Sequence, residues 1–285
     1  WLRRFGVQET LALCDAANAI PPITLRANTL KTSRAALLAA LQSAAEAPQP
    51  TLYAPEGIRC ARLREALTEL PPFQQGWCQV QDEAAQLVTH LLDPRPGERV
   101  LDACAGRGGK TGHIAQRLRN RGLLVALDND NLRLAELAGE LQRLGVGCAE
   151  IVPHDLAQPP KNLTHRPFDR VLLDAPCSGL GVLRRNPDTK WAAERADLGR
   201  FGERQLGFLK NLAPLVRPGG RLVYAVCSLE PEETDAVVAA FLEAVPGFEL
   251  ARSAADGPLA AAGLVDAAGA LRTLPHRHHM DGFFA

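Results

Sequence analysis

From residue 81 onward, short apolar segments alternate with amphipathic ones, and this alternation constrains the fold more than any other feature of the chain. Near-continuous apolar strands separated by helices favour a mostly parallel sheet with helices on both faces, an α/β fold that binds ligands at the carboxyl ends of its strands. Leucines at a spacing of 3, 4 and 3 predict one of the helices, and they are Leu134, Leu137, Leu141 and Leu144. The other predicted helices span about 81–92, 109–119, 198–214 and 231–245. The predicted strands span about 99–103, 122–128, 148–153, 169–174 and 220–226.

The first 75 residues carry neither a glycine loop nor an acid at the end of a strand. Residues 23–28 predict a strand, and Thr32 or Ser33 is a suitable cap for a helix that runs through Ala44. Prolines punctuate the segment that follows, up to Pro71 and Pro72. We therefore predict a small N-terminal α/β domain over residues 1–75 and a second domain over 76–285. Within the second domain, the alanine-rich stretch 251–270 is expected to be loop or weak helix.

Composition excludes several classes of protein. The formal net charge is zero, whereas a general polyanion binder is usually basic, so any contact with nucleic acid must come from local patches. Seven cysteines without a C-x-x-C pair argue against a disulfide framework and favour a reducing cytoplasm. No apolar stretch approaches the roughly 18 residues that span a bilayer. Because the chain starts at Trp1 and its only methionine is Met280, we expect a piece of a longer protein.

A glycine-rich turn follows the first strand of the second domain. It runs through Cys104, Ala105, Gly106, Arg107, Gly108, Gly109 and Lys110 to Thr111. The Walker phosphate-loop pattern requires a glycine where Cys104 stands, and the G-x-G-x-x-G pattern requires a third glycine where Thr111 stands. Both motifs therefore fail. What remains is a turn that a ligand can approach closely, followed by a helix whose N-terminus favours a carboxylate.

Acidic residues follow three later strands. Asp128 ends the second strand, in the position that typically binds ribose hydroxyls, Asp155 follows the third, and Asp174 ends the fourth. A pocket ringed by carboxylates would repel a pyrophosphate but would suit a nucleoside with a positively charged centre. S-adenosylmethionine, with its adenosine, carboxylate and sulfonium, meets these requirements. The alternative is that these acids only cap helices and form turns.

Two cysteines come directly after strands, each followed by a serine: Cys177 and Cys227. A thiolate that adds to carbon 6 of a cytosine makes carbon 5 nucleophilic enough to accept a methyl group. An acid beside ring nitrogen 3 would stabilise the developing charge, and a base must later remove the proton from carbon 5. Cys227, Asp174 and Cys177 supply such groups, although these features alone do not decide which cysteine attacks. The alternative, that free cysteines are small buried hydrophobes, is preferred for Cys14, Cys60, Cys78 and Cys148.

These segments resemble the RNA cytosine-5 methyltransferases of the NOL1/NOP2/Sun type. The motifs that carry the resemblance are residues 174–179, 224–228 and 102–111, together with 25–32, 81–84 and 281–284. Residues 179–188 are most similar to the bacterial Sun/Fmu branch, which methylates 16S ribosomal RNA. Members of that branch usually carry an additional N-terminal helical domain of NusB type, which we expect to be missing from this piece.

The resemblance implies a Rossmann-like class I methyltransferase domain and a role for each matching residue. Cys227 matches the nucleophile, Cys177 the second cysteine linked to product release, and Asp174 the acid beside the target base. The turn from Cys104 to Lys110, with Asp128, Asp155 and Asp174, matches the S-adenosylmethionine contacts. One departure concerns the turn, where the family usually has Ala-Pro-Gly-Gly-Lys and this chain has Gly106-Arg107-Gly108-Gly109-Lys110. The loss of proline predicts either a looser turn or a contact between Arg107 and the carboxylate of the cofactor.

Basic residues near these motifs are candidates for RNA phosphate contacts, which position a strand rather than read its sequence. They are Arg184, Arg185 and Lys190 after the Cys177 motif, with Arg26 and Lys31 in the small domain. The alternative for each is a solvated surface charge. His276, His278 and His279 lack a partner acid or cysteine at a metal-ligand spacing, so no metal is predicted.

We therefore expect a cytoplasmic, monomeric RNA cytosine-5 methyltransferase that uses S-adenosylmethionine and acts on 16S ribosomal RNA through a covalent cysteine adduct at carbon 6. The target base must leave its stack to reach a thiol, which favours a loop or an exposed strand of RNA. Two alternatives stay open: the same chemistry on transfer RNA or DNA, and a catalytically weak RNA-binding factor in ribosome assembly.

Overall fold

The computed structural model describes residues 1–192, 195–251, 259 and 262–285. The chain divides into two compact units. We call the first the thiol unit, which comprises Trp1–Pro21, Pro176–Leu206 and Ala225–Ala285. The second, the sheet unit, comprises Pro22–Ala175 and Gly207–Tyr224. Part of the alanine-rich stretch 251–270 lies outside the described residues.

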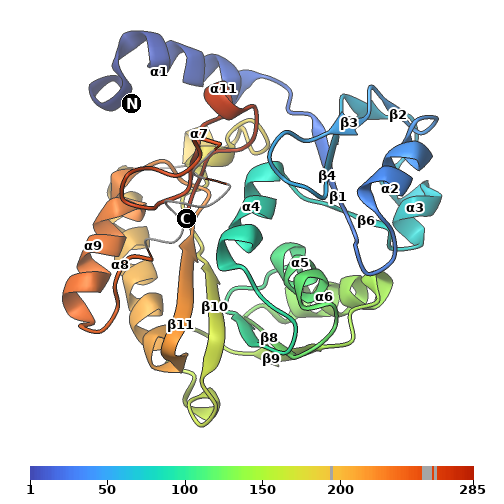
Figure 1. Cartoon of the computed structure of the whole chain (residues 1–285). Coiled ribbons are helices and arrows are strands. Elements are labelled where there is room, and N and C mark those ends of the chain that lie inside the picture. Colours follow the sequence, from blue (N-terminus) through green and yellow to red (C-terminus); the bar gives the residue numbers. More distant parts are fainter. Residues whose placement is uncertain (193–194, 252–258, 260–261) are drawn as a thin grey trace. The chain divides into compact units, whose positions relative to one another are not determined.

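The sheet unit contains the predicted methyltransferase sheet, with strands in the order β11-β10-β7-β8-β9 (Figure 1). The neighbours β10 and β7, β7 and β8, and β8 and β9 pair in parallel. The strand bounds are β7 Arg99–Asp102, β8 Leu123–Asp128, β9 Ala149–Pro153, β10 Phe168–Asp174 and β11 Val216–Ala225. The predicted α/β fold is confirmed, and the ends of its strands differ from the expected positions by up to four residues.

Three helices accompany these strands: α4 (Glu83–Leu92), α5 (Gly109–Leu118) and α6 (Asn131–Leu144). Asp82 caps α4 and Asp130 caps α6, because each side chain accepts backbone N–H groups of the first turn. The four predicted leucines of α6 are all buried. Burial of each stabilises the helix on the sheet by about 1.5–3 kcal/mol. Shorter elements of this unit are the 3-10 helices η2 Lys161–Leu163 and η4 Ala213–Leu215.

The small sheet of the N-terminal region is antiparallel and also belongs to the sheet unit, with strands in the order β3-β4-β1-β6. Its strands are β1 Ile23–Ala27, β3 Gln49–Pro50, β4 Gly57–Cys60 and β6 Cys78–Val80. Ser33 caps α2 (Arg34–Leu41), as predicted, and β2 (Ala45–Glu46) pairs with β5 (Arg62–Leu63). The helices η1 (Leu67–Glu69) and α3 (Pro71–Gln74) precede β6. The division at residue 75 stays a prediction, although a cut there would remove β6 from its sheet.

The thiol unit begins with α1 (Leu2–Asn18), which packs against α11 (Pro275–His278) and therefore lies outside the small sheet. A backbone bridge joins Val226 to β13 (Phe283–Phe284), which pairs with β12 (Arg272–Thr273). Other helices of this unit with described bounds are η3 Leu180–Val182, α7 Thr189–Ala192, α8 Arg195–Leu212, whose residues from 207 on belong to the sheet unit, η5 Pro231–Glu233 and α9 Asp235–Ala244.

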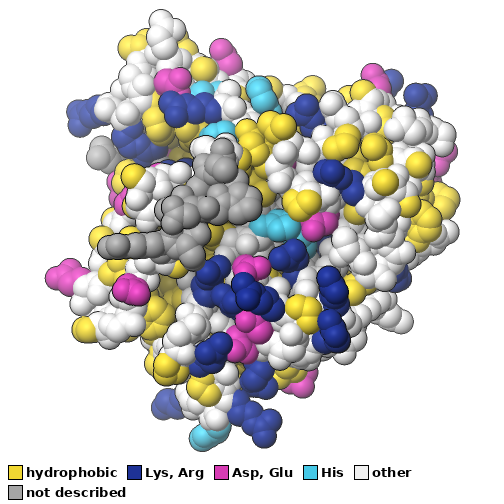
Figure 2. Space-filling model, in the orientation of Figure 1, with side chains coloured by type: hydrophobic (Ala, Val, Ile, Leu, Met, Phe, Trp, Pro, Cys, Tyr) yellow, Lys and Arg dark blue, Asp and Glu magenta, His cyan; other side chains and the backbone are white. Residues whose placement is uncertain are grey.

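The distribution of charged side chains on the surface agrees with the formal net charge of zero. Basic and acidic side chains are interspersed on the face drawn in Figure 2. In the part of the chain that the structure describes, no helix has the length and apolar character that crossing a membrane requires.

Candidate active site

The glycine-rich turn lies in the sheet unit, between the end of β7 and the start of α5. Gly106 and Gly108 both adopt left-handed backbone conformations, with φ of 53° and 84°. A Cβ atom on Gly108 would lie 2.4 Å from Cδ1 of Leu137 and would strain the left-handed backbone, so both contact and conformation favour glycine there. No side chain caps α5, and the N–H groups of its first turn are therefore suited to bind a carboxylate.

Asp128, at the end of β8, holds this turn. Its carboxylate accepts hydrogen bonds from the backbone N–H of Gly106 at 2.8 Å and of Asp130 at 3.0 Å. Each carboxylate oxygen keeps a second lone pair, so the predicted contact with ribose hydroxyls is compatible with these bonds. The contact itself stays a prediction.

Asp102, at the end of β7, was not singled out as a site residue by the sequence. Its side chain is buried, and it accepts a hydrogen bond from the Thr111 hydroxyl at 2.7 Å. Burial raises the pKa of Asp102 to about 7, with Asp174 and Asp128 adding to the rise and Thr111 and Lys110 opposing it. A buried acid that changes charge near neutral pH thus lies beneath the turn.

Lys110 and Asp174 form an ion pair, with 2.6 Å between Nζ and the carboxylate oxygen. The Lys110 side chain is largely buried, whereas that of Asp174 is 31% exposed. The structure therefore brings together two residues that were predicted separately, one in the turn and one at the end of β10. Asp155 is exposed and accepts a hydrogen bond from the backbone N–H of Ala157, which is the turn-forming alternative considered above.

Arg107, which replaces the family proline, points away from the core of the turn. Its side chain is 78% exposed, and its guanidinium forms an ion pair with Glu136 of α6. A contact between Arg107 and the carboxylate of a cofactor would have to compete with this pair.

The two predicted thiols meet in the thiol unit, where the sulfur atoms of Cys177 and Cys227 lie 3.2 Å apart. The hydrogen bond with Cys227 raises the pKa of Cys177 well above its ordinary value, and burial and the charges of Cys227 and Glu233 raise it further. The Cys177 thiol therefore keeps its proton at neutral pH.

A buried glutamate joins the two cysteine turns. One carboxylate oxygen of Glu233 accepts from the backbone N–H of Ser178 at 2.9 Å and from the Gln205 amide at 3.1 Å. The other accepts from the hydroxyls of Ser178 at 2.5 Å and Ser228 at 2.6 Å. Ser178 and Ser228 directly follow Cys177 and Cys227, so a single carboxylate fixes both turns. Sequence reasoning missed Glu233, which stands in a run of acidic residues without a distinguishing motif.

The prediction that Arg26 binds an RNA phosphate is wrong, because this residue is completely buried. Its guanidinium donates to the side chains of Gln79, Gln81 and Gln116 and, at 2.8 Å, to the carbonyl oxygen of Gly109. Burial lowers the pKa of Arg26 to about 9. Arg26 therefore connects the small sheet to the first residue of α5.

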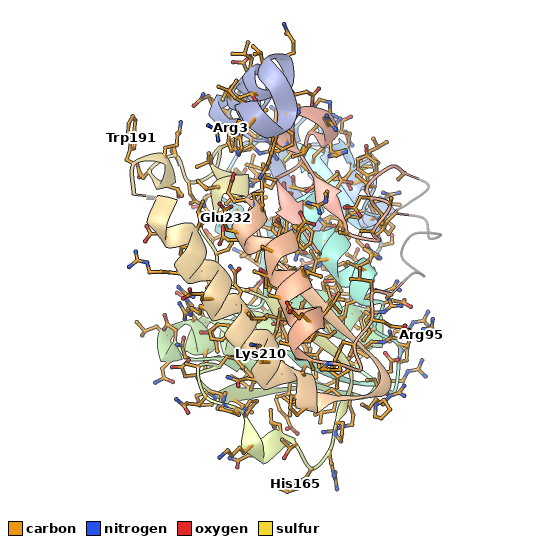
Figure 3. The ribbon with its side chains drawn as sticks, turned by 90° about the vertical axis from the view of Figure 1, so that its left-hand side faces the viewer. Arg3, Arg95, His165, Trp191, Lys210 and Glu232 are labelled. Carbon is orange, nitrogen blue, oxygen red and sulfur yellow. The ribbon has the colours of Figure 1, made fainter. Side chains whose placement is uncertain are left out.

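The other predicted RNA contacts differ in exposure. Arg184 is almost buried and donates to Asp281 at 2.7 Å, which leaves little of it for a phosphate, whereas Arg185 donates to the same carboxylate and is 28% exposed. Lys190 is exposed and donates to Asn18 at 2.6 Å. Lys31 is exposed and donates to two backbone carbonyl oxygens. Trp191, beside Lys190, is 87% exposed and points away from the ribbon (Figure 3).

A comparison with protein-family models assigns the chain to a family. Residues 89–285 match the model described as 16S rRNA methyltransferase RsmB/F. The chain belongs to this family. Residues 1–65 match a ferredoxin-like domain described as RsmF/B-like. The predicted resemblance and Rossmann-like fold are thereby confirmed.

Relatives of the RsmB/F chain agree with this assignment. It is 40% identical to the probable ribosomal RNA small subunit methyltransferase B of Synechocystis sp. over 280 residues, which cover 98% of the chain and 63% of that protein. It is 35% identical to the protein of the same name from Bacillus subtilis, over 100% of the chain and 63% of that protein. The chain thus spans less than two thirds of the length of these relatives.

Solved structures show the same fold. A methyltransferase homologue from Pyrococcus horikoshii superposes with a TM-score of 0.81 at 29% identity and covers 99% of this chain and 90% of its own. NSun6 from the same organism, solved with SFG, superposes with a TM-score of 0.83 at 22% identity, over 99% of this chain and 94% of its own.

Proposed function

We propose that this RsmB/F chain transfers a methyl group from S-adenosylmethionine to carbon 5 of a cytosine in 16S ribosomal RNA. The observation that carries the proposal is the pair of thiols, whose sulfur atoms lie 3.2 Å apart. Methyl transfer to oxygen or nitrogen requires no thiol, whereas transfer to a pyrimidine carbon requires a nucleophile that first adds to the ring.

In the proposed reaction, the Cys227 thiol loses its proton to solvent, its sulfur forms a bond to carbon 6, and the electron pair of the ring double bond becomes available at carbon 5. The cofactor would supply an electrophilic methyl group to carbon 5, with the electron pair of the broken methyl–sulfur bond left on the cofactor sulfur as a neutral thioether. A base then removes the proton from carbon 5, the sulfur–carbon bond breaks, and its electron pair returns to Cys227. The family resemblance assigns Cys227 as the nucleophile. Cys177 is the proposed acceptor of the proton from carbon 5, because the raised pKa of Cys177 makes its thiolate a strong base once it has lost its own proton.

Asp174 is proposed to contact ring nitrogen 3 of the cytosine. It lies three residues before Cys177 in the chain, so their Cα atoms are at most about 11 Å apart whatever the conformation between them. Its ion-pair partner Lys110 is a nearby source of a proton for the charge that develops on the ring.

The residues of the turn fit the proposed cofactor. The uncapped N-terminus of α5 would bind the methionine carboxylate. Asp128 would bind the ribose. Asp155 is exposed and available to the adenosine end of the cofactor.

For the RNA, the exposed Lys31 and Lys190 and the partly buried Arg185 are proposed phosphate contacts. Trp191 offers an aromatic face on which an unstacked base can lie. A ribosomal RNA substrate would place the protein in the cytoplasm. We expect it to act as a monomer.

The decisive experiment measures transfer of a tritiated methyl group from labelled cofactor to 16S ribosomal RNA, transfer RNA and DNA. We expect incorporation into 16S ribosomal RNA at cytosine, none with Cys227→Ala, and a covalent protein–RNA adduct stable in detergent with Cys177→Ala. A Cys227→Ala protein that still methylates would overturn the assignment of the nucleophile. Incorporation only into transfer RNA or DNA, or tight RNA binding without any incorporation, would favour the alternatives over the proposed function.

A further inference from the structure

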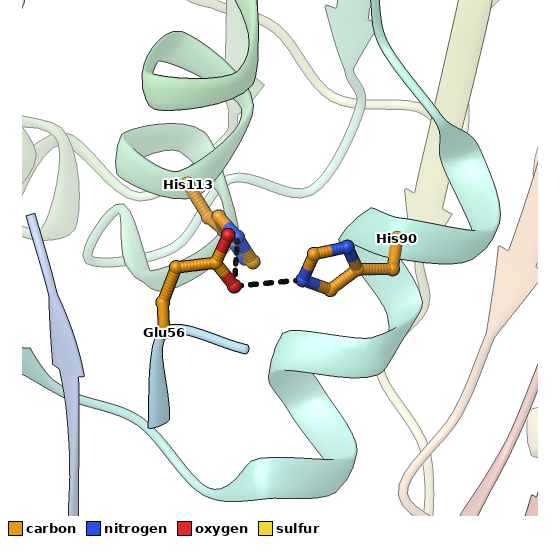
Figure 4. A group of neighbouring side chains, drawn as sticks. All are labelled: Glu56, His90 and His113. Atoms are coloured by element: carbon orange, nitrogen blue, oxygen red, sulfur yellow. Dashed lines mark hydrogen bonds and ion pairs between the residues drawn. The ribbon is translucent and has the colours of Figure 1, made fainter. Parts of the chain in front are cut away.

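A cluster of three side chains of the types that bind metals lies in the sheet unit and shares no residue with the glycine-rich turn. Glu56 comes from the residue before β4, His90 from the last turn of α4, and His113 from α5 (Figure 4). One ligand atom from each residue lies within 4.8 Å of the other two. The three residues come from distant parts of the chain, so the fold, not the local sequence, creates this group.

His113 is the member that most needs a partner. Its side chain is completely buried, yet within the described part of the chain neither ring nitrogen has a hydrogen-bond partner. Burial lowers the pKa of His113 well below its ordinary value, and the charges of Arg26, His90 and Arg117 lower it further. The imidazole is therefore neutral at pH 7, and one of its nitrogens carries a lone pair directed at no donor.

The distances fit coordination of one ion. Nε2 of His90 lies 2.8 Å, and Nε2 of His113 lies 3.8 Å, from the same oxygen of Glu56. In a tetrahedral zinc site with bonds near 2.1 Å, neighbouring ligand atoms lie about 3.4 Å apart. The two pairs with Glu56 need shifts of about half an ångström, and the two imidazole nitrogens, which lie within 4.8 Å of each other, need to approach by at most about 1.4 Å. Two imidazole nitrogens and one carboxylate oxygen form a ligand set common for zinc, with a fourth position open to water.

We propose that Glu56, His90 and His113 bind one divalent transition-metal ion of the zinc class. The ion satisfies one nitrogen of His113 and links the loop before β4 to α4 and α5. Because α5 begins at Gly109 of the glycine-rich turn, metal binding also stabilises the helix that carries that turn. The site is independent of the methyl-transfer proposal.

Two cations act on the cluster and oppose a metal ion. Arg117 is paired with Asp93 at 3.2 Å, and Arg26 donates to glutamine oxygens and to a backbone carbonyl. Glu56 supplies the compensating negative charge. Burial alone would raise the pKa of Glu56, but the hydrogen bond and charge of His90, with Arg117, lower it, so this ligand is ionised at neutral pH.

The test is titration of metal-free protein with Zn²⁺ and with Co²⁺, whose visible spectrum reports tetrahedral nitrogen and oxygen ligands. The titration uses the Cys177→Ser/Cys227→Ser background, so that the paired thiols do not bind the ion. We expect one equivalent to bind and the melting temperature to rise, with affinity at least about tenfold weaker, or 1.4 kcal/mol, in Glu56→Gln, His90→Gln and His113→Gln.

His165→Gln is the matched control, because His165 is an exposed histidine of the same unit (Figure 3), and it should bind as the parent protein does. If His113→Gln does not fold, the partly exposed His90 and Glu56 still decide the question through their own variants. Binding below one equivalent, or equal binding by the parent and both of these variants, would show that the cluster is only a hydrogen-bonded group.

Discussion

The arrangement of the two cysteine turns depends on Glu233, and its replacement by glutamine is the most informative perturbation of the thiol unit. Glutamine keeps the size of the side chain but exchanges one acceptor oxygen for an N–H₂ donor. The oxygen that remains can still accept from Ser178 N–H and Gln205. The new donor faces the hydroxyls of Ser178 and Ser228, both of which donate to Glu233 in the wild-type protein.

The expected loss of stability follows from these contacts. A hydrogen bond to a charged group contributes about 2 kcal/mol and a neutral one about 1 kcal/mol, so weakening two of them lowers the free energy of unfolding by about 2 kcal/mol. Glu233→Ala removes the acceptor of four donors, and at about 1 kcal/mol for each neutral donor left unsatisfied the free energy of unfolding falls by about 4 kcal/mol. The hydroxyls of Ser178 and Ser228 would then form hydrogen bonds with other groups. The backbone shifts that this requires would move the adjacent Cys177 and Cys227.

Displacement of a reacting group by about 1 Å typically reduces the rate about 100-fold. We therefore expect Glu233→Gln to lower kcat for methyl transfer roughly 10- to 100-fold while the KM for RNA changes little. This split separates positioning of the thiols from RNA binding. The rate at which iodoacetamide alkylates the two thiols should also change in this variant, because the two sulfur atoms move relative to each other.

Glu232→Gln is the matched control, since Glu232 is the adjacent residue and is exposed (Figure 3). It should leave kcat, the alkylation rate and the urea midpoint as in the wild-type protein. The reasoning is refuted if Glu233→Gln keeps the wild-type kcat, or if its loss of activity lies wholly in KM.

Three further predictions concern the sheet unit. Asp102 has a pKa of about 7 when folded and about 4 when unfolded, so the folded state holds an extra proton between these values and stability falls as pH rises from 4 to 7, by up to about 4 kcal/mol. Asp102→Asn should remove this fall in urea unfolding at pH 5 and pH 8, and an unchanged pH dependence would contradict the assignment. Arg26→Lys should lower the free energy of unfolding by about 2–4 kcal/mol and should weaken cofactor binding measured by calorimetry, because lysine cannot donate to the same four acceptors. An unchanged cofactor affinity would show that Arg26 does not support the turn. Arg107→Pro should leave methyl transfer intact, since only an exposed ion pair is lost, and a collapse of activity would show that Arg107 contacts the cofactor.

Local signals explain which elements could be predicted. Ser33, Asp82 and Asp130 each cap the helix that follows, and the leucine spacing in residues 134–144 gives a helix with the expected buried face. Such features depend on hydrogen bonds and contacts within about one turn of chain, which the sequence contains directly. The strand-end thiols were found for a related reason, because the ends of neighbouring strands in an α/β sheet lie at one edge.

Long-range partners explain what the sequence could not reveal. Arg26 was expected on the surface, but β1 is flanked by β4 and β6, and acceptors for its guanidinium come from glutamines up to 90 residues away. Glu233 is similar, because its importance depends on Ser178, 55 residues earlier. In both cases a buried charged group became acceptable only once distant neutral groups supplied its hydrogen bonds.

The same long-range contacts account for the unusual glycine-rich turn. The loss of the family proline predicts a turn with greater backbone freedom, yet two charged side chains fix its backbone at both ends. Asp128 accepts from the N–H of Gly106, and Arg26 donates to the carbonyl of Gly109. Proline at position 107 would restrict φ at one residue, whereas these two bonds restrict residues on either side of it. A turn with an exposed Arg107 can therefore stay ordered, and its ability to hold a cofactor depends on Asp128 and Arg26 rather than on proline.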